Sequence, residues 1–274
     1  MLNKLYLKHI ITFFTIIFMT LKHLILAAFL TITALNICAQ NSLARPDPEK
    51  QSNNLKISHL TGDYYIYETY DIFKGVRLPA SSMYIVTSVG VVLIDTPWQE
   101  TQVQPLLDSI AKRHHKKVVL CLVTHSHNDK TAGLDALRKH GVKTYSSKQT
   151  LDLCRQNKEK EAEFYFTKDT TFTVGNHTFQ TYYPGEGHAP DNTVVWCADA
   201  KMLYGGCLVK STESSGIGNI ADANLKEWPS SIKKVMKKYP NPKYVVPGHY
   251  SWKSNKGLKH TLELLQRYNK HKSQ

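Results

Sequence analysis

The sequence predicts one domain, residues 55–274, in which two mixed β-sheets pack face to face and helices cover their outer faces. Two observations lead to this prediction. β-Branched and aromatic runs followed by helical segments occur twice along the chain, which is typical of layered proteins. Residues 118–124 form a continuous apolar run, as in a strand that is buried on both faces. A chain of 274 residues is also long enough to bury a sizeable core.

The first half of the domain is predicted to contain strands that give way to alternating helices and strands. Glycines separate the β-branched runs, and residues 70–79, which contain glycine and proline, predict a hairpin loop. Apolar residues at helical spacing predict the helices. We expect strands at 64–67, 82–87, 89–95, 118–124 and 142–146, and helices at 99–114, 133–140 and 147–157.

The second half repeats the pattern, with strands first and helices near the end. Turn sequences at Gly175-Asn176 and Asp199-Ala200 separate short apolar runs, as in hairpins. The last two helices enclose one more strand. We expect strands at 172–174, 179–183, 194–197, 202–205 and 244–247, and helices at 224–239 and 257–270.

Residues 1–39 differ from the rest of the chain, since they contain three lysines, no acidic residue and two apolar runs. Neither run reaches the ~20 residues that a membrane-spanning helix needs. We therefore interpret the segment as a cleaved export signal. Residues 40–54 then form an N-terminal extension, and we expect a periplasmic protein without stable membrane association.

The start and the end of this signal leave alternatives open. A start at Met19 gives a signal of ordinary length, whereas a start at Met1 gives an unusually long one, so we favour Met19. Cleavage is expected near Ala39. Lipidation of Cys38 is the less favoured alternative, because Ile37 stands where a lipoprotein signal has a small residue.

The charge balance says more about partners than about the fold. Lysine and arginine outnumber aspartate and glutamate by 35 to 22, which gives a net charge of +13. The basic residues are scattered, and no pattern of alternating basic and aromatic residues suggests stacking on nucleic acid. We expect no nucleic-acid partner, a modest attraction for anionic small molecules, and a monomer, since no segment predicts an obligate interface.

Side chains that bind metal ions recur where predicted strands end. The strongest motif is His125-Ser126-His127-Asn128-Asp129, which follows the buried strand and precedes a helix. Ligand sites of open α/β sheets lie at such strand ends, and zinc takes imidazole, carboxylate and thiolate ligands. Three more candidates follow later strands through glycine-containing loops: His188, Cys207 and His249.

Each of these signals has an ordinary structural explanation when it is taken alone. Two histidines in one loop are more often unrelated to metal, and Cys207 alone is more often a small buried side chain. All six candidates occur on the same kind of loop, and this joint pattern favours a metal site. The other histidines, such as His177, lie in predicted turns and helices, and we assign them structural roles.

The six candidates resemble the ligands of class B metallo-β-lactamases, in particular the di-zinc subclass with a three-histidine site and an Asp-Cys-His site. The resemblance covers about residues 55–270. It includes the shorter segments Leu93–Trp98, Tyr182–Gly185, Gly205–Lys210 and Gly218–Ile220. It implies an αββα sandwich, which agrees with the fold predicted from the sequence pattern.

Two residues separate this family from other hydrolases of the same superfamily. Thioesterases and nucleases of that superfamily usually carry a histidine directly after the motif's aspartate, and a second aspartate that bridges the two metals. This sequence has Lys130 and Cys207 at those places. A charged lysine cannot be a ligand, and a thiolate does not easily replace a bridging carboxylate, so both residues favour the lactamases.

The resemblance implies two Zn²⁺ ions and opening of the β-lactam ring of penicillins, cephalosporins and carbapenems, which confers antibiotic resistance. His125, His127 and His188 would hold the first ion, and Asp129, Cys207 and His249 the second. Asp129 would also orient the attacking water.

Other residues acquire substrate roles by the same resemblance. Lys210 would bind the carboxylate that these antibiotics share, and Asn219 would donate to the lactam carbonyl. Asp95 would support the ligands from behind. Residues 70–79 would form a flap over the substrate, or an ordinary hairpin tip.

Two rival interpretations remain. The first is another hydrolase of the same fold that acts on thioesters or phosphoesters. The second is an exported zinc-binding protein without catalytic activity, which would tend to fill every coordination position of its metal.

Overall fold

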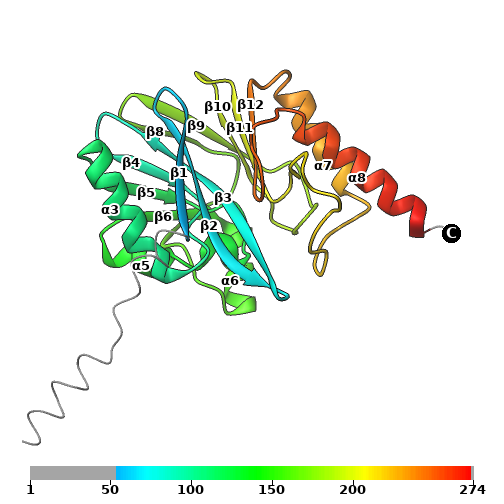
Figure 1. Ribbon diagram of the computed structural model, residues 1–274, viewed down its shortest axis with the longest axis horizontal. Helices are drawn as coiled ribbons and strands as arrows, with labels where there is room; N and C mark the ends of the chain where they lie inside the picture. Colours follow the sequence, from blue (N-terminus) through cyan, green and yellow to red (C-terminus); the bar gives the residue numbers. More distant parts are fainter. Residues whose placement is uncertain (1–53, 273–274) are drawn as a thin grey trace, which may run out of the picture. The chain divides into compact units, whose positions relative to one another are not determined.

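Two β-sheets lie face to face with helices on their outer faces, so the predicted fold class is confirmed (Figure 1). The protein is described by a computed structural model that covers residues 54–272; the predicted signal and nearly all of the extension lie outside this range. Among the described residues, no helix is both long and apolar enough to span a bilayer.

The first sheet has seven strands in chain order. Neighbouring strands are antiparallel from β1 to β4 and parallel from β4 to β7, so the sheet is mixed. The strands are β1 (Leu55–Thr61), β2 (Tyr64–Phe73), β3 (Val76–Val86), β4 (Val91–Ile94), β5 (Val118–Leu122), β6 (Lys143–Ser147) and β7 (Phe164–Phe166).

The second sheet has five strands in the order β12-β11-β10-β9-β8. The strands β8 to β11 are antiparallel to their neighbours, and β12 joins β11 in parallel. The strands are β8 (Thr171–Val174), β9 (His177–Tyr182), β10 (Val194–Cys197), β11 (Met202–Gly206) and β12 (Tyr244–Pro247).

The helices cover the outer faces of the two sheets. Figure 1 shows α3 and α5 beside the first sheet, and α7 and α8 beside the second. The helical segments are η1 (Glu100–Gln102), α3 (Val103–His114), α4 (Asn128–Thr131), α5 (Leu134–Lys139), α6 (Lys148–Asn157), α7 (Trp228–Lys238) and α8 (Gly257–Lys272).

Side chains that alternate along the strands divide the core into three layers. Met83 packs in the layer between the sheets, whereas its neighbour Tyr84 packs under the helices of the first sheet. Tyr204 and Leu203 divide in the same way between the inner layer and the layer under α7 and α8. Because successive side chains of a strand point to opposite faces, both sheets are buried on both sides.

The segment 70–79 is an extended ribbon and not the predicted loop. Strands β2 and β3 stay paired up to Phe73 and Val76, which leaves only Lys74 and Gly75 as the turn. Both turn residues have positive φ, 51° and 80°, the conformation that two-residue hairpin turns use because it matches the strand twist. The register continues past Pro79, so proline did not mark the end of a strand here.

Other differences lie at the edges of the sheets and at helix starts. Strands β1 and β7 were not predicted. Both are edge strands with partly exposed side chains, and β7 has only three residues, too few to show an alternating pattern. Helix α7 begins at Trp228, four residues later than expected, with Pro229 in its first turn. Proline is favoured at the first helical positions, which explains the later start.

A cluster of two buried rings and two half-exposed carboxylates, which we call the clasp, joins turns of the two sheets. His177, at the start of β9, contacts Asp63 through Nε2 at 2.8 Å and Asp199 through Nδ1 at 3.1 Å. The Tyr64 hydroxyl donates to the other oxygen of Asp199 at 2.6 Å. Asp63 lies in the β1–β2 turn of the first sheet, and Asp199 in the β10–β11 turn of the second. These four residues therefore tie the sheets together.

Replacing His177 with alanine is expected to lower the free energy of unfolding by about 1–3 kcal/mol, because the buried ring and its hydrogen bonds to two carboxylates are lost. Urea unfolding followed by circular dichroism measures the change. His140→Ala, which alters an exposed histidine after α5, is the matched control and should change stability by less than about 0.5 kcal/mol. Equal effects of the two substitutions would argue against the clasp.

Candidate metal centre

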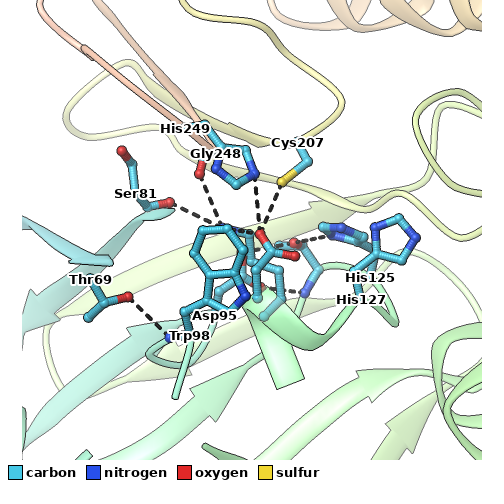
Figure 2. Close-up of polar contacts among 12 residues, drawn as sticks. Thr69, Ser81, Asp95, Trp98, His125, His127, Cys207, Gly248 and His249 are labelled. Atoms are coloured by element: carbon cyan, nitrogen blue, oxygen red, sulfur yellow. Dashed lines mark hydrogen bonds and ion pairs between the residues drawn. The ribbon is translucent and has the colours of Figure 1, made fainter. Parts of the chain in front are cut away.

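The six candidate ligands gather beside one cavity of about 710 Å³, although they come from four separate loops. His127, Asp129, His188 and His249 line the cavity. Each loop follows the carboxyl end of a strand, where β5, β9, β11 and β12 end at the same edge of the sandwich. Figure 2 shows Cys207 and His249 approaching residues 125–129 from the side of the second sheet; we call these residues, the last two of which begin α4, the histidine loop.

His125 is held by a relay of hydrogen bonds that starts at Asp95. The Asp95 carboxylate accepts from the Thr124 amide at 2.7 Å and from the Thr124 hydroxyl at 2.9 Å. Thr124 Oγ1 in turn lies 3.3 Å from Nδ1 of His125. A proton on Nδ1 leaves the lone pair on Nε2, which is buried without a hydrogen-bond partner among the described residues. Such an orphaned nitrogen fits a metal ligand.

His127 and His188 present ring nitrogens to each other. Nε2 of His127 lies 2.8 Å from Asp222, which favours the proton on that nitrogen and frees Nδ1. Nδ1 of His127 then lies 3.1 Å from Nε2 of His188. Ligands at ~2.0 Å from one tetrahedral ion are about 3.3 Å apart. The distance therefore suits two nitrogens that share an ion.

Burial keeps the inner histidines neutral. It lowers the pKa of His125 and His188 well below the ordinary range, and the nearby histidines and lysines lower both further. The centroids of the His125, His127 and His188 rings lie 4.7–5.4 Å apart. Neutral imidazoles at this spacing offer lone pairs to a cation at neutral pH.

A second group consists of Asp129, Cys207 and His249. The Cys207 thiol donates to Asp129 Oδ2 over 3.5 Å, and Nε2 of His249 lies 3.4 Å from the same oxygen. Nδ1 of His249 donates to the carbonyl of Pro79 at 2.7 Å, which directs the Nε2 lone pair toward Asp129. Burial raises the pKa of the Cys207 thiol, so a metal would have to displace its proton.

Lys130 lies fully buried behind these ligands. Its ammonium is 3.3 Å from Asp129 and donates to the carbonyls of Ser81 and Gly248. Burial alone would lower the pKa of Lys130, but Cys207, Asp129 and Asp95 raise it. Burial would likewise raise the pKa of Asp129, but Lys130 and His249 bring it well below its usual range. Asp129 is therefore a carboxylate held ready for a cation.

Glycine is required where the two ligand loops of the second sheet meet. A Cβ on Gly248 would lie 2.5 Å from Sγ of Cys207 and 2.6 Å from its amide nitrogen. Gly206, with φ of 53°, accepts a hydrogen bond from Gly248 at 2.7 Å. This close approach of the two backbones brings Cys207 next to His249, and any side chain at 248 would separate them.

The predicted substrate and support residues lie around the same cavity, with Asp95 beneath it. Lys210 and Asn219 both line the cavity. The Lys210 ammonium lies 5.1 Å from the centre of the Trp228 ring, and burial lowers its pKa. Asp95 also accepts from the Tyr204 hydroxyl at 2.6 Å, and burial raises its pKa to about 6. In the described part of the chain, its hydrogen bonds reach the ligands through Thr124 alone.

Sequence reasoning missed several supporting residues. Asp222 orients His127 although 95 positions separate them, and it lies in a polar loop without any motif. Trp98 lines the cavity with its ring 5.7 Å from that of His249, and Tyr204 supports Asp95 from the second sheet. Only Trp98 had a signal in the sequence, as the last residue of the segment Leu93–Trp98 that resembles the family.

The ligand atoms form overlapping groups suited to metal ions. Their atoms lie within 4.8 Å of one another in three sets: His125 with His127 and Asp129, His125 with His188 and Cys207, and Asp129 with Cys207 and His249. Imidazole, carboxylate and thiolate together suit zinc, which takes nitrogen, oxygen and sulfur ligands in tetrahedral sites. The fold and this donor set define a metalloprotein whose ions would lie beside an open cavity.

Comparison with known proteins identifies the family. A family model described as the metallo-beta-lactamase superfamily matches residues 75–249. A type 2 metallo-beta-lactamase of Elizabethkingia meningoseptica is 40% identical over 237 residues, which cover 86% of this chain and 93% of that protein. Metallo-beta-lactamase IND-1 of Chryseobacterium indologenes is 38% identical, over 76% of this chain and 87% of that protein.

Solved structures agree with these relatives. A metallo-beta-lactamase from Pontibacter korlensis superposes with a TM-score of 0.76 at 37% identity, over 78% of this chain and 99% of that one. Metallo-beta-lactamase IND-7 gives a TM-score of 0.75 at 38% identity, over 77% and 98%. The chain therefore belongs to the metallo-β-lactamase superfamily, and the resemblance to its class B members is confirmed. The assignment to the di-zinc subclass stays a prediction.

Titration of the metal-free protein with Co²⁺ is expected to produce a near-ultraviolet charge-transfer band, because Cys207 would bind as a thiolate. Cys207→Ser should abolish the band and leave a weaker second site. Cys154→Ser is the matched control, since Cys154 is also a buried free cysteine but belongs to none of the ligand groups among the described residues. A band that survives in Cys207→Ser would remove Cys207 from the ligands.

Proposed function

We propose that this protein hydrolyses the lactam amide bond of penicillins, cephalosporins and carbapenems with two Zn²⁺ ions, and thereby confers resistance to these antibiotics. The observation that carries the proposal is the convergence of six ligand side chains beside a cavity large enough for a small-molecule ligand. The names of the relatives agree with it. A bound zinc ion would supply a water ionised near neutral pH and would polarise the lactam carbonyl.

The residues of this chain contribute orientation and charge. We assign His125, His127 and His188 to the first ion, and Asp129, Cys207 and His249 to the second. Asp129 is 8% exposed and negatively charged, so one of its oxygens can accept a hydrogen bond from the attacking water. Buried groups that are fixed before the reaction stabilise developing charge best, since they need not reorganise.

Lys210 and Asn219 are assigned to substrate binding. The Lys210 ammonium is buried in the cavity wall, and no hydrogen bond or ion pair within residues 54–272 engages it. An unpaired buried cation is costly, so a substrate carboxylate would compensate it. The Asn219 amide lines the same cavity, has no hydrogen bond within residues 54–272, and can donate to the lactam carbonyl.

The cavity also favours a catalytic zinc site over the alternative of a zinc-binding protein without catalytic activity. A storage or structural site closes around its ion, whereas a catalytic site leaves a position open. Four of the six ligands here line open space. Lys130 argues against a thioesterase or phosphoesterase. Those enzymes have a further metal ligand at this position, where this chain has an ammonium group.

Hydrolysis of a chromogenic cephalosporin tests the proposal directly. The zinc-loaded protein should open the ring, a strong chelator should abolish turnover, and added Zn²⁺ should restore it, because the ions supply the nucleophile. A thioester and a phosphodiester serve as competing substrates. Hydrolysis of either one without ring opening would overturn the proposal, and so would turnover that survives the chelator.

Lys210→Ala is expected to raise KM about tenfold, the effect of losing one charge-assisted hydrogen bond of about 1.4 kcal/mol. The change in kcat should be smaller, because the carboxylate lies away from the reacting bond. Lys210→Arg keeps the charge and should recover part of the affinity. An unchanged KM for several lactams would remove Lys210 from the binding site.

We further propose that the protein is exported to the periplasm as a monomer. The acid-free, apolar character of residues 1–39 supports export. Intact mass of the protein secreted by an expressing bacterium should correspond to a chain that begins close to Gln40. A mass that retains Met1 or Met19 would contradict cleavage, and a mass with an attached lipid would favour modification at Cys38.

A further inference from the structure

Three acidic side chains line the cavity away from the candidate ligands. Asp71 lies on β2, Glu159 follows α6, and Glu213 lies on the loop after Lys210. Glu213 is exposed and the other two are half-buried, whereas Asp129 on the cavity floor is buried. Asp71, Glu159 and Glu213, which we call the acidic rim, therefore lie at the solvent-accessible part of the cavity.

Each rim carboxylate is positioned by neutral donors. Asp71 accepts from Nε2 of Gln99 at 2.7 Å, and Glu159 accepts from the side-chain amide of Asn128 at 3.3 Å. Glu213 accepts from the backbone amide of Ser251 at 3.3 Å. In all three, these bonds involve one oxygen only. The second oxygen has no hydrogen bond in the part of the chain that the structure describes.

No cation neutralises the rim. The ion pairs of residues 54–272 engage many other acidic residues but none of these three. This is unexpected in a chain with a net charge of +13, in which basic residues outnumber acidic ones by 35 to 22. Among the residues that line the cavity, Lys210 is the one lysine or arginine.

Lys210 places a positive charge in the wall of the cavity whose opening carries the acidic rim. It is 7% exposed, its ammonium has no hydrogen bond or ion pair in the described range, and it faces the same cavity as the rim. The cavity thus combines an unpaired buried cation in its wall with unpaired anions at its opening. A ligand that combines a carboxylate with a positively charged substituent would match both.

We propose that the acidic rim selects β-lactams that carry a permanent positive charge on a ring substituent, such as the pyridinium group at C3 of some cephalosporins. This inference rests on the proposed hydrolysis of β-lactams and names a preferred substrate class within it. The rings of Phe73 and Tyr250 also line the cavity and can favour an organic cation through their faces.

A pair of cephalosporins tests the preference. Cephaloridine and cephalothin share the same C7 side chain, but the first carries a pyridinium at C3 and the second a neutral acetoxy group. The measured quantity is the ratio of their kcat/KM values for the zinc-loaded protein. The ratio should fall when the salt concentration is raised, because salt screens interactions between exposed charges.

The rim variant Asp71→Asn, Glu159→Gln and Glu213→Gln removes the charges but keeps an oxygen for each anchoring hydrogen bond. The control variant Asp108→Asn, Glu163→Gln and Glu227→Gln makes the same change in net charge at exposed positions outside the cavity. The rim variant should lower the ratio about fivefold, as three exposed ion pairs of modest strength would. The control variant should leave the ratio within about twofold of the native value.

A second measurement does not depend on turnover. Binding of both compounds to the chelator-treated protein can be followed by tryptophan fluorescence, since Trp98 lines the cavity. The pyridinium compound should bind more tightly to the native chain than to the rim variant. The neutral compound should show a smaller difference between the same two proteins.

The outcomes distinguish the two proposals. If neither cephalosporin is hydrolysed by the zinc-loaded protein, the proposed function fails. If both are hydrolysed, but the ratio is equal in the native protein, the rim variant and the control variant, the selection by the rim is overturned while the function stands. A ratio that falls equally in both variants would assign the effect to net charge, and it would also overturn the selection by the rim.

Discussion

The buried ammonium of Lys130 is the constraint on which the arrangement of this centre depends. Isolated in the interior, such a charge costs several kcal/mol, and only well-placed partners offset the cost. Its partners come from both halves of the molecule: Ser81 on β3, Gly248 after β12, and Asp129 in the histidine loop. None of them can move without exposing or isolating the charge. The sheets and the loop between them are therefore held in one relative position.

Asp95 extends the same principle to the other side of the histidine loop. Its carboxylate binds Thr124 beside it and Tyr204 on the opposite sheet, so one buried group again spans the two sheets. Asp95 itself has φ of 65°, an unusual conformation for a residue other than glycine. Strain of this kind persists where the surroundings determine the backbone. Here they do, because the carboxylate must reach Thr124 and thereby orient His125.

Much of the fold could be predicted from the sequence, because buried strands and amphipathic helices leave strong patterns of apolar residues. The prediction failed where the pattern was weak or misleading. Residues 70–79 contain glycine and proline, which locally predict a loop. The two strands nevertheless stay paired in continuous register as far as Phe73 and Val76. Strands β1 and β7 were missed because each is an edge strand defined by its pairing with one neighbour, and β7 spans only three residues.

By itself, the sequence determined the layered fold and the kinds of side chain available to a metal ion, since few residue types bind zinc and glycines mark the loops that carry them. Only the tertiary structure decided which nitrogen is free in His127, His249 and His125. Asp222 and Pro79 reach the first two rings from distant segments, and Asp95 holds Thr124 beside the third. The tertiary structure also decided the role of Lys130. The sequence showed only that Lys130 cannot be a ligand, whereas packing places its positive charge beside Asp129 and keeps that carboxylate ionised.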